Sequence, residues 1–275
     1  MTERPVVDIT AAVGGWPHPW PNVAELAAVL PSDKWTLIGG LMAQLHVTHH
    51  GIDAVRPTND IDIVLHIETN RGVPSATADA LESIGYRLVD SVDPRNNTAH
   101  RFTRADAHID IVTSGVANAS EKVFNGTSSD GLDIVDVLIA DHPSPRVEER
   151  LRGRDMVKIE RGTQALRRTL DVRMEIIPRT ITTVSVPRPF GAVILKAAAY
   201  RADSRDPGRH LFDAAALLAC IEDPFAEREN FGGSDRARLA TLERNLLEEH
   251  PAWLRLPRWA REQGQGALRL LRLPD

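Results

Sequence analysis

The chain has 275 residues, which is enough for one large domain or two modest ones. Its 42% hydrophobic and 26% charged residues are typical of a globular protein, and its net charge of −5 excludes a nucleic-acid coat protein that binds through bulk charge. The single cysteine, Cys220, excludes an intramolecular disulfide and fits a reducing compartment. A signal-peptide pattern and a bilayer-length apolar run are both missing, so we expect a cytoplasmic protein with no membrane partner.

The first part of the chain predicts alternating helices and strands. Residues 1–20 contain proline and glycine without a sustained period and are interpreted as an irregular arm. Apolar residues at helical spacing predict helices at 21–30, 41–45 and 75–84. Branched apolar runs predict strands at 35–38, 60–65, 86–89, 101–103, 107–113 and 132–139.

The strand at 60–65 carries the first candidate site residues. Asp60 and Asp62 lie two positions apart, so a strand sends both carboxylates to one face and Ile61 to the other. Neighbouring carboxylates repel each other unless they share a cation, and hard oxygen ligands of this kind suit Mg²⁺. The alternative interpretation of an isolated Asp-x-Asp pattern is a solvated strand face.

Gly39 and Gly40 lie between the strand at 35–38 and the following helix. Such a turn permits close approach of the backbone and presents free amide groups to phosphates. A plain turn is the alternative. The order of glycine turn, helix and carboxylate strand favours a joint phosphate and metal site over two unrelated features.

Further acids interrupt two later apolar strands. Asp110 lies between isoleucines at 109 and 111. Because burying an unpaired charge is costly, Asp110 either faces solvent or joins the metal site from a neighbouring strand. Asp133 and Asp136 in the strand at 132–139 are expected on the solvent or loop side.

The region from 143 to 189 is rich in arginine. It predicts a helix at 162–168 and a strand at 181–186. Residues 146–173 hold nine Lys and Arg against five Asp and Glu, an excess of four positive charges. This excess fits a surface for a nucleic-acid backbone, and it fits a solvated mixed-charge face equally well.

A Pro-Arg-Pro break at 187–189 divides the chain into a first domain, 1–186, and a helical domain, 187–275. Two apolar helices follow the break, and they carry Lys196 and Asp213. One interpretation is a buried ion pair between helices. The other is that Lys196 holds a triphosphate or tunes a base, with Asp213 orienting it.

Three histidines, His46, His49 and His50, lie at or beyond a helix end. No second group of ligands follows them at useful spacing. We therefore expect them to act as cations at the C-terminus of the helix rather than as metal ligands.

The Gly39-Gly40 turn, the Arg-Pro-Thr-Asn-Asp-Ile-Asp block at 56–62, Asp110, and the helices that carry Lys196 and Asp213 occur in an order that resembles the polymerase-β-like nucleotidyltransferase superfamily. Within it, the chain is similar to AbiEii-type toxins of bacterial toxin–antitoxin systems over roughly residues 35–220. Two departures are a second glycine where the family has serine and a longer gap between turn and carboxylates.

The resemblance implies an α+β fold, with a small mixed β-sheet flanked by helices and a mainly helical C-terminal half. It implies that Asp60, Asp62 and Asp110 ligate one or two Mg²⁺ ions. Gly39, Gly40, Thr58 and Lys196 would bind the nucleotide, and Lys196 and Asp213 would match the essential lysine and aspartate of the helical half.

The activity that this resemblance implies is nucleotidyl transfer from a nucleoside triphosphate to an acceptor hydroxyl. By analogy the acceptor is a tRNA 3′ end, and the partners include a cognate antitoxin protein. Two alternatives stay open: an antibiotic-type transferase acting on a small molecule, and a catalytically inactive nucleotidyltransferase fold that serves as a binding module.

Overall fold

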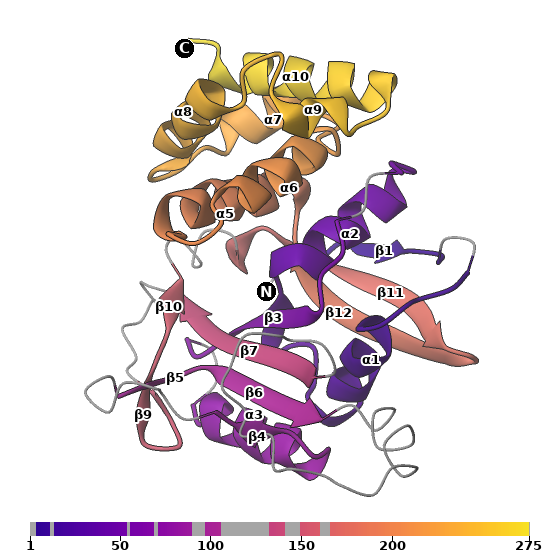
Figure 1. Ribbon diagram of the computed structural model, residues 1–275, viewed down its shortest axis with the longest axis vertical. Coiled ribbons are helices and arrows are strands. Elements are labelled where there is room, and N and C mark those ends of the chain that lie inside the picture. Colours follow the sequence, from indigo (N-terminus) through magenta and orange to yellow (C-terminus); the bar gives the residue numbers. More distant parts are fainter. Residues whose placement is uncertain are drawn as a thin grey trace, which may run out of the picture.

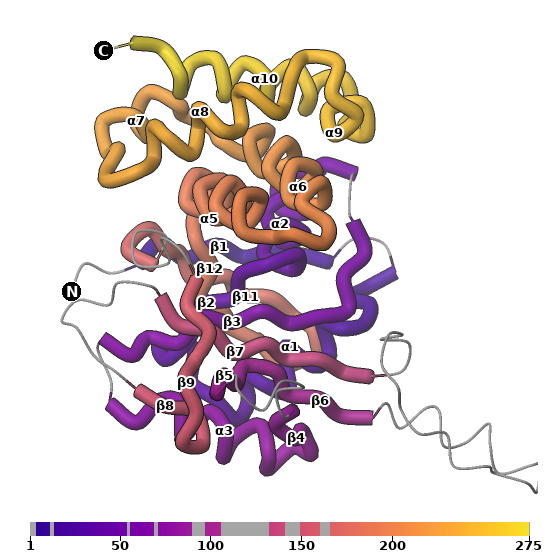
Figure 2. Tube along the Cα trace, turned by 60° about the vertical axis from the view of Figure 1, so that its left-hand side comes forward, coloured from indigo at the N-terminus to yellow at the C-terminus, as the bar shows by residue number. Residues whose placement is uncertain are grey.

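A computed structural model describes residues 4–11, 14–53, 56–68, 71–89, 97–105, 132–140, 149–159 and 166–274. Within these ranges the chain is a mixed α+β protein, and its strands all precede the helices that follow Pro187. Figure 1 shows the C-terminal helices stacked above the sheets, and Figure 2 shows the same layers from the side. No helix in these ranges is long and apolar enough to cross a bilayer.

The largest sheet has the strand order β2-β3-β7-β6-β4, with β10 also paired to β7. The central strands β3 and β7 run parallel, while β2 and β6 run antiparallel to their neighbours in the centre. These strands are β2 (Trp35–Leu37), β3 (Asp60–Leu65), β4 (Arg87–Leu88), β6 (Arg101–Ala105), β7 (Leu132–Ala140) and β10 (Lys158–Ile159).

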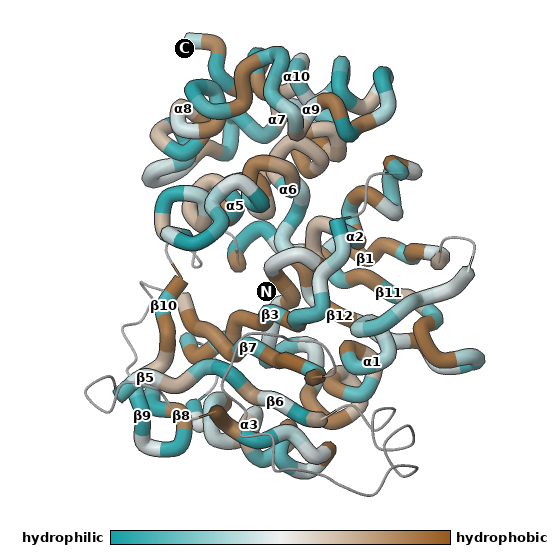
Figure 3. Tube along the Cα trace, viewed as in Figure 1, coloured by the Kyte–Doolittle hydropathy of each residue, from teal (hydrophilic) through white to brown (hydrophobic). Residues whose placement is uncertain are grey.

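One face of this sheet forms the core of the first part of the chain. Ile61 and Ile63 of β3, Val135 and Val137 of β7, and Phe102 of β6 are completely buried there. Since side chains alternate along a strand, the aspartates between these residues are directed to the other face. Figure 3 shows β7 as a largely hydrophobic strand, as expected for a central strand covered on both sides.

The second sheet corrects the interpretation of residues 1–20. Its order is β1-β11-β12, and β1 (Val6–Asp8) pairs in parallel with β11 (Thr169–Ile177), which forms a hairpin with β12 (Thr180–Pro187). The predicted irregular arm therefore contains an ordered strand. It was missed because three residues are too few to show a period. A third sheet joins β5 (Thr98–Ala99), β9 (Arg154–Met156) and β8 (Arg150–Leu151).

A row of buried polar side chains connects the first two sheets. The Thr36 hydroxyl on β2 lies 2.7 Å from Nε2 of His66 and 3.0 Å from the Ser185 hydroxyl on β12. The other ring nitrogen of His66 donates to the Asp33 carbonyl over 2.8 Å. Because Nδ1 carries the proton, Nε2 accepts from Thr36, and Ser185 in turn donates to Thr36. These hydrogen bonds satisfy groups that would otherwise be costly to bury.

Three helices accompany the strands of the first part of the chain. They are α1 (Trp20–Val29), α2 (Gly39–His49) and α3 (Val73–Ser83). The predicted helices at 21–30, 41–45 and 75–84 are confirmed, although α2 begins two residues earlier, at the glycines themselves. Helix α2 contacts β3 on one side and the C-terminal helices α5 and α6 on the other.

The remainder of the described chain is helical from Pro189 onward. Its helices are α5 (Pro189–Ala202), α6 (Gly208–Leu218), α7 (Pro224–Glu229), α8 (Asp235–Asn245), α9 (Pro251–Leu254) and α10 (Arg258–Arg272). Gly264 explains the tight packing of α10 on α6: an added Cβ would lie 2.8 Å from the Trp253 ring and 3.3 Å from the Ala215 carbonyl oxygen. The domain boundary at 186/187 stays a prediction.

Candidate functional site

A row of acidic side chains crosses the sheet at the junction of β3 and β7. Asp60 and Asp62 project from one face of β3, and Asp62 is directly in register with Asp136 of the parallel strand β7. Register partners in neighbouring strands point the same way and lie about 4.8 Å apart. The structure therefore places Asp136 beside the Asp60–Asp62 pair.

The position of Asp136 corrects the expectation that Asp133 and Asp136 face solvent. Both are buried, at 6% and 8% exposure. They lie on opposite faces of β7 because they are three residues apart. Asp133 accepts hydrogen bonds from Arg104 and contacts His18, so it belongs to the other face.

The proximity of these acids perturbs their ionisation. Burial and then the charge of Asp136 raise the pKa of Asp62 to about 7. The same two causes, in the same order, raise the pKa of Asp60. The ammonium of Lys196 acts in the opposite direction on Asp62, so this lysine also lies within electrostatic reach of the row. Burial and mutual repulsion disfavour the ionised form of these carboxylates, and a bound cation would stabilise that form.

A guanidinium already contacts one end of the row. Arg101 of β6 is the register partner of Asp136, and it donates from Nε to Oδ1 over 2.8 Å and from Nη2 to Oδ2 over 2.7 Å. By contrast, no hydrogen bond or ion pair from the described part of the chain reaches the carboxylates of Asp60 or Asp62. In the described residues, no three His, Cys, Asp or Glu side chains come together closely enough to hold a metal ion.

The glycine turn lies directly against these carboxylates. Gly39 has a φ of +72°, and a Cβ added there would lie 1.9 Å from Oδ2 of Asp62. A Cβ on Gly40 would lie 2.9 Å from Cβ of Thr58. Only glycine allows this approach at Gly39, which brings the amino end of α2 next to Asp62. The first-turn amides of a helix have no intrahelical acceptor, so they are available to an anion.

Lys196 and Asp213 form a direct pair, as one of the two interpretations expected. Nζ of Lys196 on α5 lies 2.6 Å from Oδ2 of Asp213 on α6, and both side chains are 5% exposed. Arg56 adds a second cation, with Nε 3.2 Å from Oδ1 of Asp213. Burial opposes ionisation of Asp213, but the two cations outweigh it and lower its pKa. The buried ion pair is therefore confirmed. Lys196 also lies within electrostatic reach of Asp62, and its role in holding a triphosphate or tuning a base stays a prediction.

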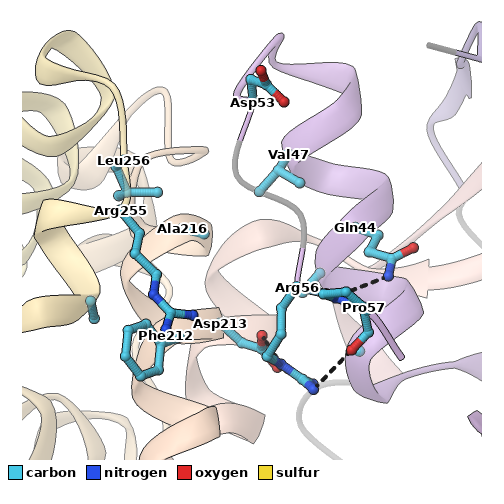
Figure 4. Close-up of a pocket in the computed structure, with 13 residues that line it drawn as sticks. Gln44, Val47, Asp53, Arg56, Pro57, Phe212, Asp213, Ala216, Arg255 and Leu256 are labelled. Carbon is cyan, nitrogen blue, oxygen red and sulfur yellow. Dashed lines mark hydrogen bonds and ion pairs between the residues drawn. The ribbon is translucent and has the colours of Figure 1, made fainter. Parts of the chain in front are cut away.

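A pocket of about 390 Å³ opens beside this pair, between α2 and α6. Figure 4 shows Arg56 turned toward Asp213 and Arg255 lying along the ring of Phe212, where its guanidinium carbon is 4.2 Å from the ring centroid. Gln44 donates to the Arg56 carbonyl over 2.9 Å and thereby fixes the loop. The other lining residues are Gly40, Ala43, Val47, Asp53, Pro57, Ala216, Ala252 and Leu256.

The expectation for the histidine group is wrong for His46. Its side chain is buried, and its Nε2 donates to the Pro187 carbonyl over 2.8 Å. Burial lowers the pKa of His46 to about 4, and burial likewise lowers the pKa of His49. His46 is therefore neutral at pH 7 and fastens α2 to the end of β12 instead of acting as a C-terminal cation.

Several predictions lie outside the described residues. Asp110 and the strand at 107–113 are among them, as are most of the predicted helix at 162–168 and part of the arginine-rich region. The structure brings Asp60, Asp62, Gly39, Gly40 and Thr58 together and places Lys196 and Asp213 near them. Sequence reasoning missed Arg101 as a site residue and misplaced Asp136, although an acid inside the run LDIVDVLIA is the same signal that singled out Asp110.

Comparisons with protein-family models, curated proteins and solved structures found no match to this chain.

Proposed function

We propose that the protein is a Mg²⁺-dependent nucleotidyltransferase, which transfers a nucleoside monophosphate from a nucleoside triphosphate to an acceptor hydroxyl. The observation that carries this proposal is the contact between the glycine turn and Asp62: an anion-binding helix end and a row of carboxylates share one side of the sheet. A metal-assisted reaction of a phosphate uses both features, because the cation lies between the acids and the phosphates.

The residues present fit Mg²⁺. All donors in the row are hard carboxylate oxygens, which this ion prefers, and the ion pair between Arg101 and Asp136 supports a place for a cation beside them. Asp60 and Asp62 would hold the ion. Asp136 is in register to contribute, and Asp110 is the third carboxylate that the family resemblance implies. When bound, Mg²⁺ would neutralise phosphate charge and lower the pKa of the attacking hydroxyl.

The chain's own residues then have distinct roles. The amides at Gly39 and Gly40, with the Thr58 hydroxyl, bind the triphosphate. Lys196 compensates phosphate charge and is held in place by Asp213. The acceptor oxygen forms a bond to the α-phosphorus, the bond to pyrophosphate breaks, and the hydroxyl proton is released. Catalysis of this kind is mainly positioning and electrostatic stabilisation.

The acceptor and the biological role are extensions of this proposal. The family resemblance supports a tRNA 3′ end as acceptor, with the arginine-rich region as its contact surface, and supports a toxin that acts in the cytoplasm with a cognate antitoxin. The pocket beside Asp213 favours a second candidate, a transferase for a small-molecule acceptor, because its volume suits a drug-sized ligand.

The ion pair in which Arg101 donates to both oxygens of Asp136 favours a third candidate, a binding module without activity. An arginine in place of a metal ion is one way in which a catalytic site is lost. This candidate predicts that nucleotides bind without any transfer, whatever divalent ion and acceptor are supplied.

Incubation with Mg²⁺, labelled nucleoside triphosphates and either total RNA or a panel of hydroxyl-bearing antibiotics separates these candidates. Label on tRNA supports the first, label on a small molecule the second, and no transfer to any acceptor the third. Asp60→Ala and Asp62→Ala should abolish transfer while circular dichroism shows an intact fold. Undiminished transfer in either variant would refute the assignment.

A further inference from the structure

The side chains of Arg101, Asp136 and Asp62 form a continuous line across three strands. Arg101 of β6 pairs with Asp136 of β7, and Asp136 pairs with Asp62 of β3. Register partners project to the same side of a sheet, so the guanidinium lies on the face that carries the acids. Arg101 is therefore part of the candidate metal site, although its positive charge prevents it from acting as a metal ligand.

The contact between Arg101 and Asp136 has the geometry of a strong pair. Two parallel hydrogen bonds of 2.8 Å and 2.7 Å engage both oxygens of Asp136. Such forked contacts are short, charge-assisted and directional. The hydrogen bond to Asp136, with further contributions from Asp60 and Asp62, raises the pKa of Arg101, so the guanidinium keeps its charge throughout the physiological range.

We propose that Arg101 is an internal counter-ion that competes with the divalent cation for Asp136. This inference rests on the proposed function for the identity of the cation. While the fork is closed, both oxygens of Asp136 serve the guanidinium, and its positive charge also repels an ion approaching Asp60 and Asp62. The protein without nucleotide consequently binds divalent ions weakly.

Arg101 can leave this position without disrupting the core. Its side chain is 41% exposed, whereas the Asp136 side chain is 11% exposed. A guanidinium that releases a carboxylate binds a phosphate with the same forked geometry. When the cation arrives together with a triphosphate, Arg101 therefore exchanges Asp136 for a phosphate oxygen. Binding of metal and nucleotide is thus coupled, and the site fills with both or with neither.

The chain provides a matched control on the same strand. Arg104 of β6 also pairs with an aspartate of β7: its Nε donates to Oδ2 of Asp133 over 3.0 Å. This second contact lies on the opposite face of the sheet, away from Asp60 and Asp62. Removing Arg104 deletes the same charge from the same strand and leaves the candidate metal site unaltered.

The experiment measures binding of Mn²⁺, a paramagnetic substitute for Mg²⁺, by electron paramagnetic resonance in the absence of nucleotide. Arg101→Gln should bind Mn²⁺ about tenfold more tightly than the wild type, or better, because one repelling unit charge is lost. Arg101→Lys keeps the charge and should retain the weak affinity. Arg104→Gln should match the wild type, and Asp62→Asn should weaken binding in every background.

A second arm adds a non-hydrolysable triphosphate analogue. It should raise the Mn²⁺ affinity of the wild type by a larger factor than that of Arg101→Gln, since only the wild type has a fork to open. If Arg101→Gln binds Mn²⁺ no more tightly than the wild type, the counter-ion is refuted while the proposed function stands. If no protein binds Mn²⁺ even with the analogue present, the proposed function and this inference fail together.

Discussion

The Nζ atom of Lys196 lies 2.6 Å from Oδ2 of Asp213, and the two helices that carry them pack directly against each other. Asp213 also accepts from Nε and Nη2 of Arg56. One buried carboxylate therefore compensates two cations from different parts of the chain. Because one carboxylate faces two cations, removing the carboxylate and removing one cation should change stability by different amounts.

Asp213→Ala should destabilise the fold more than Lys196→Met. The first variant leaves two cations without their carboxylate, whereas the second leaves Asp213 paired with Arg56. Breaking a buried ion pair costs about 3–5 kcal/mol, and we expect Asp213→Ala near the upper end of this range. Urea unfolding at pH 7.5 measures both. Equal losses, or a larger loss for Lys196→Met, would show that Arg56 does not share the charge.

Gly39→Ala should perturb the candidate site through a single added atom. The new Cβ would lie 1.9 Å from Oδ2 of Asp62, and the φ of +72° disfavours any L-residue. Gly51→Ala is the matched control, because Gly51 has a φ of +64° and nothing within 4 Å of an added Cβ.

Backbone strain should lower the free energy of unfolding of both variants by about 1 kcal/mol. Gly39→Ala should lose more, because Asp62 must shift, and it should also lose nucleotidyl transfer. Unfolding curves and the transfer assay measure the two effects. Similar stability and activity in the two alanine variants would mean that the contact between turn and carboxylate has no consequence.

Acid should destabilise the protein through His46. Burial lowers the pKa of His46 to about 4 in the folded state, while the unfolded value is about 6.5. The unfolded state then binds the proton more readily, so this contribution to stability is present above pH 6.5 and is lost as the pH falls toward 4. The full change is about 3 kcal/mol.

His46→Gln retains a donor for the Pro187 carbonyl but cannot be protonated. Its free energy of unfolding should therefore decline less between pH 6.5 and 4 than that of the wild type. His66, whose pKa burial also lowers, is intact in both proteins, so the difference between the two curves reports His46. Parallel curves would contradict the prediction.

The buried polar row between the sheets should show a graded response. Thr36→Val removes the hydroxyl that donates to His66 and accepts from Ser185, whereas Ser185→Ala removes only the outer donor. An unsatisfied buried polar group costs about 1–3 kcal/mol, so Thr36→Val should lose roughly twice as much stability as Ser185→Ala. Thermal unfolding of both variants measures this order. A larger loss for Ser185→Ala would contradict the assignment of Ser185 as the outer donor and Thr36 as the donor to His66.

Local patterns predicted most of the elements that form the site. The alternation of Asp and Ile at 60–63 gave β3 with its correct bounds, and the glycine turn was found at the start of α2. Strand β11 was missed, although Leu170, Val172 and Met174 alternate with charged residues along it. The charged residues that alternate with them also fit an arginine-rich surface, so the period of two alone does not identify this strand.

Local sequence patterns do not predict which residues of neighbouring strands lie side by side. Asp62, Asp136 and Arg101 come together through the register of β3, β7 and β6. On one side β3 pairs with β2, the strand before it in sequence, but on the other it pairs with the distant β7 instead of with β4, the next strand. A period of two determines which residues share a face of one strand. It does not determine which strands lie side by side, and this choice depends on the packing of the whole domain.

The pairing of β1 with β11 constrains the order in which the chain can fold. Arg4 and Asp171 are 167 positions apart, and β1, which follows Arg4, pairs with β11 in that distant segment. As the protein emerges from a ribosome, β1 cannot pair with β11 until the intervening sheets and helices have been made. Such long-range closure slows folding and leaves an open edge exposed meanwhile, so newly made chains should depend on chaperones more than the stability of the finished protein would suggest.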